Sequence, residues 1–237
     1  MNRPFKFKQF TVQQDRCAMK IGTDSVLLGS WASVDHDPFN ILDLGAGTGI
    51  LSLMLAQRSH AEQIEAVEID DDAFEQCSEN FEDSSWNDRL FCFHASLLEY
   101  VEAVDESFDL IICNPPFYSE DYKTQKKARD LARFSDAMPS SHIIYAVSHF
   151  LSDTGKFALI LPYKTEHDFI EEASIIGLFA NRILRVKGHA TSKFKRSLIE
   201  FSYQKTAVDT SELVIETGRH QYTEDYIALT KDFYLKM

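Results

Sequence analysis

Three polar positions in the chain follow short apolar runs, and their residue types could bind a ligand. Asp43 opens the glycine-rich stretch DLGAGTG at residues 43–49. Glycines let a ligand approach the backbone closely, and the N-terminus of a following helix attracts polar groups. Glu68 ends the next apolar run, at about the separation at which an acid binds ribose hydroxyls in nucleotide-binding folds. Asn114 follows residues 109–113 (DLIIC), which are apolar except for Asp109, and begins the sequence NPPF.

The elements that must position these residues alternate between strands and helices. Strands are predicted at 41–44, 64–68, 90–93, 108–113 and 155–161, and helices at 50–59, 71–81, 97–101, 143–151 and 166–176. This alternation indicates βαβ units and a parallel sheet, whose ligands lie beyond the carboxyl ends of the strands. Asp43, Glu68, Ser96 and Asn114 are therefore predicted to share one rim. Two final strands, 179–186 and 197–203, are expected to be antiparallel.

The chain ends extend this core. Phe5, Phe7 and residues 10–12 indicate extended or hairpin structure around 13–16, and a short helix is predicted at 25–32 with Thr23 or Asp24 as its N-cap. A last helix is predicted at 223–230. One domain is expected over 1–237, with an N-terminal extension at 1–36 and a core at 37–237.

The acidic balance of the chain is unevenly distributed. Net charge is −13, yet residues 61–107 alone hold 15 Asp and Glu against one Arg. The remaining 190 residues carry 23 basic and 22 acidic side chains. Because salt screens exposed charges beyond roughly 8 Å, local charge governs a phosphate contact. The overall charge therefore does not exclude a nucleic-acid partner.

The four cysteines are scattered without C-x-x-C spacing. This pattern favours reduced thiols in a cytoplasmic protein, and no metal site is expected. No apolar stretch is long enough to predict a transmembrane helix, and the N-terminus lacks the apolar core of a signal peptide. We therefore expect a cytoplasmic protein with no membrane partner, and a monomer.

The glycine stretch, Glu68 and NPPF together resemble the class I S-adenosylmethionine-dependent methyltransferases that act on planar amino groups. The resemblance implies a Rossmann-like α/β fold with a mostly parallel seven-stranded sheet, an antiparallel last strand, helices on both faces and a short N-terminal hairpin and helix extension. It also implies S-adenosylmethionine as cofactor. The implied cofactor-binding residues are Thr23, Asp24, Asp43, Gly45, Gly47, Gly49, Glu68, Ile69, Ser96 and Asn114.

The resemblance gives these residues particular roles, some with open alternatives. Asp43 faces the cofactor ammonium group or accepts hydrogen bonds that order the loop. Glu68 binds both ribose hydroxyls, and Ile69 packs on the adenine. Ser96 stands where many family members have an acid that recognises the adenine amino group. The segment TDSVLLGSWA closes over the cofactor, although Asp24 could serve only as a helix cap.

The expected catalytic residues are Asn114, Pro115, Pro116 and Phe117. An exocyclic amine is a poor nucleophile because its lone pair is delocalised into the ring. The Asn114 side-chain oxygen and the Pro115 carbonyl can accept its two hydrogens and free the lone pair. Two prolines stiffen the turn and fix the direction of the carbonyl. Phe117 would stack on the target base.

Two basic segments, in loops 123–133 and 182–196, are candidate phosphate contacts. The second holds six Lys or Arg and no acid. Solvated surface is the alternative for both. The RNA-binding candidates are Lys123, Lys126, Lys127, Arg129, Arg133, Lys193, Phe194, Lys195 and Arg196.

Beyond the class-wide motifs, the chain resembles the bacterial tRNA1(Val) adenine-37 N6-methyltransferase family over nearly its whole length. The more specific matches are FKFKQFTVQQDRCAMKIGTDSVLLGSWA and YTEDYIALTKDFYLKM. The resemblance implies methylation of the exocyclic N6 of an adenine in tRNA. Phe117 instead of tyrosine and Ser96 instead of an acid depart from the family pattern. Alternatives are a release-factor glutamine N5-methyltransferase, a ribosomal RNA guanine-N2 methyltransferase and a non-catalytic RNA-binding module.

Overall fold

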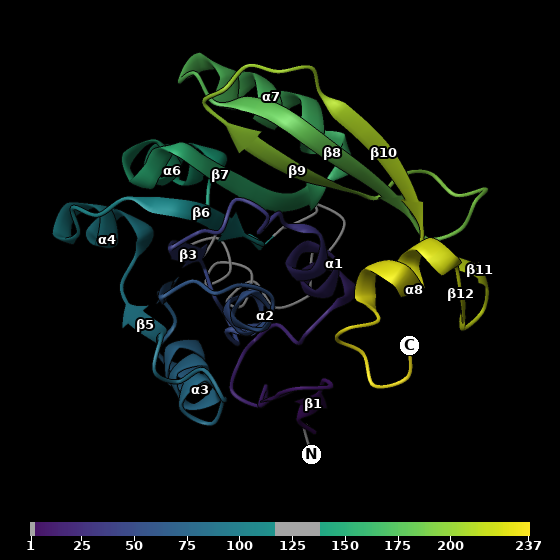
Figure 1. The fold of residues 1–237 in the computed structure, drawn as a ribbon, viewed down its shortest axis with the longest axis horizontal. Helices are drawn as coiled ribbons and strands as arrows, with labels where there is room; N and C mark the ends of the chain where they lie inside the picture. Colours follow the sequence, from purple (N-terminus) through teal and green to yellow (C-terminus); the bar gives the residue numbers. More distant parts are fainter. Residues whose placement is uncertain (1–2, 117–137) are drawn as a thin grey trace, which may run out of the picture.

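A single eight-stranded sheet forms the centre of the computed structural model, which describes residues 3–116 and 138–237. The strand order is β10-β8-β9-β7-β6-β3-β4-β5 (Figure 1). The sheet strands are β3 (Asn40–Leu44), β4 (Gln63–Glu68), β5 (Leu90–His94), β6 (Phe108–Cys113), β7 (Leu151–Pro162), β8 (Phe179–Lys187), β9 (Arg196–Ser202) and β10 (Asp209–Val214). The helices are α1 (Thr23–Trp31), α2 (Ile50–Arg58), α3 (Asp71–Glu82), α4 (Leu97–Ala103), α6 (Ser140–Phe150), α7 (Glu166–Ile175) and α8 (Glu224–Thr230), with a short 3-10 helix η1 at Tyr163–Thr165.

Strand direction confirms the mostly parallel sheet. β3, β4, β5, β6 and β7 pair in parallel, and β9 pairs antiparallel with both β7 and β8. The expected count of seven strands is wrong, because β10 adds an eighth strand parallel to β8. β10 has the sequence DTSELV with four exposed residues at its start, so backbone pairing at the sheet edge holds it without an apolar pattern.

Alternation along the central strands supplies an apolar core on each face of the sheet. Ile41 of β3 packs with α1, α2 and α3, while its neighbour Leu42 packs with α4, α6 and α7. The helices therefore cover both faces, as Figure 1 shows. Since the strands of this core are parallel, the carboxyl ends of β3, β4, β5, β6 and β7 lie along one edge.

The N-terminal hairpin is present, but its turn lies elsewhere than expected. β1 (Phe5–Lys6) pairs with β2 (Thr11–Val12), and the Phe7 N–H donates to the Phe10 carbonyl. The predicted turn at 13–16 is wrong. That segment runs beside α3 instead, where the Gln13 N–H donates to Asn80 and the Arg16 guanidinium binds Glu79. Contacts to a distant helix decided its course.

Three other predicted boundaries also shift. α1 begins at Thr23 with Gly22 as N-cap and no side-chain cap bond, so the predicted cap at Thr23 or Asp24 is wrong. α6 begins at Ser140 and β7 at Leu151, both earlier than predicted. The last helix, α8, has the Thr223 side chain as its cap, and a small hairpin of β11 (Glu216–Gly218) and β12 (Gln221–Tyr222) precedes it.

Charge is separated along the sheet. The acidic segment 61–107 forms β4, α3, β5 and α4, at one end of the strand order. The basic segment 182–196 belongs to β8, β9 and their connection, toward the other end. Among the described residues, no helix is both long and apolar enough to cross a lipid bilayer, and no group of three or more His, Cys, Asp or Glu is placed to bind a metal ion.

Candidate active site

The glycine turn after β3 connects that strand to α2. The Gly45 and Ala46 N–H groups donate to the Val67 carbonyl of β4, which fixes the turn against the neighbouring strand. Gly47 has φ +56° and open space where a Cβ would stand. A left-handed backbone favours glycine there, and the open side admits a ligand. Gly49, at φ +76°, has a different reason, since a Cβ would meet Phe81 at 2.5 Å and Cys77 at 2.8 Å.

Asp43 is fully buried beneath this turn. Its Oδ2 accepts hydrogen bonds from the Ser52 N–H at 3.2 Å and the Ser52 hydroxyl at 2.8 Å, which tie the strand end to the first turn of α2. Its Oδ1 is buried and has no partner among the described residues. Burial raises the pKa of Asp43 to about 7, opposed by the Ser52 hydrogen bonds and reinforced by the charge of Glu68.

The raised pKa of Asp43 makes a prediction about stability. Below pH 4 the carboxyl is protonated in both states, and between pH 4 and 7 only the folded state keeps the proton. Stability from this group is therefore lost as pH rises toward 7. Relative to Asp43→Asn, the wild type should lose ~1 kcal/mol or more between pH 5 and pH 8. Thermal unfolding of both proteins across that range measures this. The exposed Asp88→Asn is the control, and parallel curves for wild type and Asp43→Asn would contradict the prediction.

Glu68 connects the glycine turn to the end of β4. One carboxylate oxygen accepts the Gly47 N–H at 2.7 Å. The other accepts the Ile69 and Asp70 N–H groups at 2.8 and 2.9 Å. The side chain is only 9% exposed, so Glu68 is not part of a solvated acidic run. Ile69 beside it is 52% exposed, which leaves an apolar surface next to the carboxylate.

Asn114 is anchored by a residue that sequence reasoning missed. Its Nδ2 donates to the Ser25 hydroxyl of α1 at 2.9 Å, across 89 residues of chain. None of the described residues donates to its Oδ1, so within the described part of the protein the amide oxygen is available as an acceptor. Ser25 lies in the segment TDSVLLGSWA, but nothing in that segment indicates which of its residues contacts the NPP turn.

The neighbouring residue of α1 is held by an ion pair. Asp24 binds the Arg196 guanidinium, with Nε 2.7 Å from Oδ2. Two sequence candidates with different expected roles, cofactor contact for Asp24 and RNA contact for Arg196, are thus brought together. The pair fixes the start of α1, and hence Ser25, against the start of β9. Thr23 precedes them at the exposed first position of the helix.

Ser96 is the N-cap of α4. Its hydroxyl accepts the Glu99 N–H, and the Glu99 carboxylate accepts the Ser96 N–H at 2.9 Å, which forms a capping box. The spacing S-x-x-E at 96–99 is the sequence signal for this role. Helix capping by itself therefore accounts for Ser96 at this position.

A cavity of about 280 Å³ opens beside the NPP turn. Pro115 and Pro116 form one wall, and Thr165 and Asp168 of the η1–α7 segment form another. Phe117 and the basic candidates of the first loop lie outside the described residues: Lys123, Lys126, Lys127, Arg129 and Arg133. Phe194, Lys193 and Lys195 lie in the β8–β9 connection, where both lysines are exposed.

The strand order, with a glycine turn after its central strand and an NPP turn after the adjacent one, is that of a class I methyltransferase domain. A family model of the methyltransferase small domain matches residues 18–164. A solved structure of a predicted O-methyltransferase from Agrobacterium tumefaciens superimposes with a TM-score of 0.65 over 89% of this chain and 96% of its own. At 20% sequence identity, that likeness shows the fold alone.

Sequence relatives are much more specific. A tRNA1(Val) (adenine(37)-N6)-methyltransferase of Flavobacterium psychrophilum is 57% identical over 98% of this chain and 100% of its own length. Its counterpart in Flavobacterium johnsoniae is 58% identical with the same coverage. The chain belongs to the tRNA1(Val) (adenine(37)-N6)-methyltransferase family. The resemblance noted from the sequence is thereby confirmed.

Proposed function

We propose that this protein transfers a methyl group from S-adenosylmethionine to the exocyclic N6 of adenine 37 in tRNA1(Val), in the cytoplasm. The observation that carries the proposal is the Asn114 amide on the rim of the sheet, whose nitrogen donates to Ser25 and whose oxygen has no donor among the described residues. The proposed substrate is the one given in the names of its full-length relatives.

The residues around the glycine turn fit the cofactor. Gly47 leaves open space over the turn, and Asp43 Oδ1 is a buried acceptor without a partner among the described residues, suited to the ammonium group of the methionine portion. Glu68 presents a largely buried carboxylate for the ribose hydroxyls, beside the exposed side chain of Ile69 for the adenine. The Ser96 hydroxyl keeps its proton and one lone pair for the adenine edge after capping α4.

The chain's own residues would activate the target amine. S-adenosylmethionine, when bound, supplies a methyl group on a positively charged sulfur. Asn114 Oδ1 and the Pro115 carbonyl would accept hydrogen bonds from the two N–H groups of the amine. These bonds would draw the nitrogen toward tetrahedral geometry and direct its lone pair at the methyl group. Pro115 and Pro116 limit backbone motion, so the acceptors are oriented before substrate arrives. Thr23 and Asp24 lie at the start of α1, in the N-terminal extension that we propose covers this rim.

Ser25 is proposed as a positioning residue that acts through Asn114. Ser25→Ala should lower kcat about tenfold and leave the KM for tRNA and the Kd for S-adenosylmethionine within a factor of two, because only the orientation of the amide is lost. Ser25→Thr keeps the hydroxyl and should recover most of the rate. Steady-state kinetics and calorimetry measure these values. Equal losses in both variants, or a raised KM alone, would contradict this role.

Purified protein with labelled S-adenosylmethionine and tRNA1(Val) transcripts tests the proposed function. N6-methyladenosine should appear in nuclease digests, and a transcript with guanine at position 37 should accept no label. N2-methylguanosine in digests of ribosomal RNA incubated in the same way would instead support the guanine alternative. Label on release-factor protein with none on tRNA would support the glutamine alternative. Cofactor binding without transfer to any of these would favour an RNA-binding module.

A further inference from the structure

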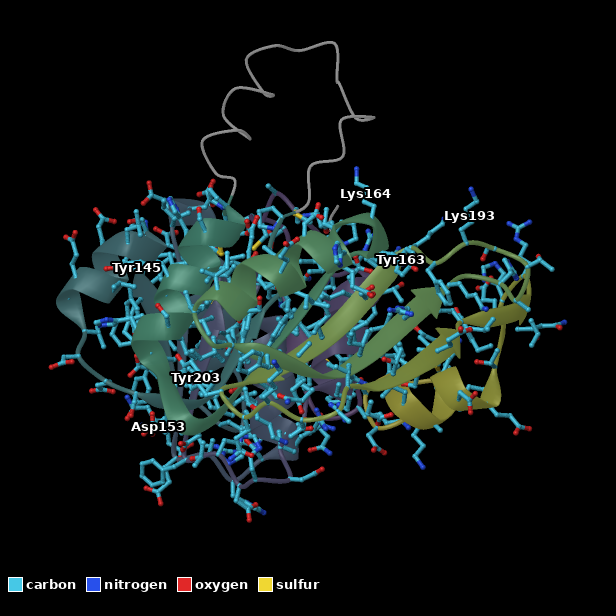
Figure 2. The ribbon with its side chains drawn as sticks, turned by 90° about the horizontal axis from the view of Figure 1, so that it is seen from above. Tyr145, Asp153, Tyr163, Lys164, Lys193 and Tyr203 are labelled. Carbon is cyan, nitrogen blue, oxygen red and sulfur yellow. The ribbon has the colours of Figure 1, made fainter. Side chains whose placement is uncertain are left out.

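The rim that carries Asn114 continues past β7 to an aromatic and basic surface. η1 follows the carboxyl end of β7, and the β8–β9 connection returns to the same edge because β8 runs parallel to β7. The Tyr163 N–H donates to the Lys195 carbonyl at 3.1 Å, which joins the two segments. In Figure 2, Lys164 and Lys193 extend from the same edge of the molecule, with Tyr163 near both.

Two aromatic rings lie side by side at this junction. The ring centroids of Tyr163 and Phe194 are 5.3 Å apart. Lys187 Nζ lies 4.9 Å from the Phe194 centroid, and the Arg185 guanidinium carbon lies 5.7 Å from that of Tyr163. Tyr163 is 38% exposed. The rings are thus supported by cations and still present surface to solvent.

Most of the basic residues in 182–196 have a structural role. Four of the six are bound to carboxylates: Arg182 to Glu200, Arg185 to Glu166, Lys187 to Glu212 and Arg196 to Asp24. Lys193 and Lys195 have no carboxylate within 4.0 Å among the described residues, and the same holds for Lys164 of η1. These three exposed lysines therefore carry positive charge that the described part of the protein does not neutralise.

We propose that the Tyr163–Phe194 ring pair and the lysines Lys164, Lys193 and Lys195 bind single-stranded RNA next to the target base. The inference rests on the proposed function, since a tRNA substrate must bring its phosphates and neighbouring bases across this rim. Stacking on aromatic rings and unpaired cations along the backbone are the contacts that single-stranded nucleic acid uses. We name this set of five residues the ring–lysine surface.

The ring–lysine surface is continuous with the catalytic turn. The cavity beside Pro115 and Pro116 reaches Thr165, the last residue of η1, and Tyr163 begins that same short helix. A base held at the NPP turn would leave its neighbouring nucleotides at η1. The acidic segment 61–107 lies at the opposite end of the strand order, where it does not oppose phosphate.

Charge removal tests the lysines. The triple variant carries Lys164→Ala, Lys193→Ala and Lys195→Ala. Its KM for tRNA should rise at least tenfold near 100 mM salt, while kcat and the affinity for the cofactor stay within a factor of two of the wild type. The log–log salt slope should fall by about 0.7 for each phosphate that the variant no longer neutralises. Lys205→Ala, which removes one positive charge away from the surface, is the control for the single variant Lys193→Ala. Lys205 is, like Lys193, an exposed lysine, but it lies over the ring of Phe179 and follows β9 at the opposite edge, where Figure 2 labels Tyr203.

Ring removal tests stacking separately. Phe194→Leu keeps apolar volume and should weaken tRNA binding about tenfold, nearly independently of salt. Tyr163→Ala should do the same, whereas Tyr163→Phe keeps the ring and should match the wild type. Thermal unfolding confirms that each variant is folded.

The two hypotheses fail differently. If wild-type protein methylates tRNA and the triple variant keeps the same KM and salt slope, the ring–lysine surface is overturned and the proposed function stands. If wild-type protein labels no tRNA, the proposed function is overturned, and the proposed RNA-binding role of the ring–lysine surface is overturned as well. A loss as large in Lys205→Ala as in Lys193→Ala would also contradict the surface, because it would show a general effect of charge.

Discussion

Asn114→Ala should bind S-adenosylmethionine nearly as tightly as the wild type and lose about two to three orders of magnitude in methyl transfer. The reason is that the amide oxygen is an oriented acceptor for a reacting group, and loss of one such group typically costs several kcal/mol of barrier. The Ser25 contact shows that this amide is held in place. Calorimetry with the cofactor and single-turnover transfer to tRNA separate binding from chemistry.

A second asparagine provides the control for this experiment. Asn181 donates its amide to the Gln204 carbonyl and the Thr206 hydroxyl at 2.8 Å each, far from the NPP turn along the strand order. Asn181→Ala removes the same chemical group and should retain wild-type turnover. An Asn114→Ala protein with more than about a tenth of wild-type turnover at saturating cofactor would rule out the assigned catalytic role.

Glu68→Ala should raise the Kd for S-adenosylmethionine by one to two orders of magnitude. The substitution removes charge-assisted acceptors for the ribose hydroxyls, each worth about 1.5–3 kcal/mol before compensation. It also releases the Gly47, Ile69 and Asp70 N–H groups that the carboxylate now accepts, so the glycine turn loses one of its connections to β4 and keeps those of Gly45 and Ala46 to Val67. Calorimetry gives the change in Kd. Glu68→Gln, which keeps one acceptor oxygen, should fall between wild type and Glu68→Ala.

The acidic segment itself supplies the matched control for Glu68. Glu62 belongs to the same segment but lies exposed just before β4, at the opposite end of that strand from Glu68. Glu62→Ala removes an equal charge and should leave cofactor affinity unchanged. Equal affinities for the Glu68→Ala and wild-type proteins would show that Glu68 serves only to order the turn. Equal losses in both variants would indicate a long-range charge effect.

Local patterns were sufficient wherever the structure depends on neighbouring residues. The strand Phe108–Cys113 was predicted at its observed bounds, because its sequence FDLIIC is apolar at every position except Asp109, as expected for a buried strand. The last helix, predicted at 223–230, is observed at Glu224–Thr230, with Thr223 as its N-cap. Parallel strand order then placed Asp43, Glu68, Ser96 and Asn114 on one rim without coordinates. β10 was missed because its polar sequence gives no burial pattern.

The sequence by itself therefore determined the family, the parallel core of the sheet and the order of chemical groups along its rim. Tertiary structure decided which group each of them contacts. Ser25 meets Asn114 across 89 residues and Asp24 meets Arg196 across 172, and no periodicity records such pairs. It also divided the basic segment 182–196 into cations that bind carboxylates and lysines that bind none among the described residues. The physical reason is that hydrophobic patterning acts over a few residues, whereas an ion pair or hydrogen bond requires two side chains that only the complete packing brings together.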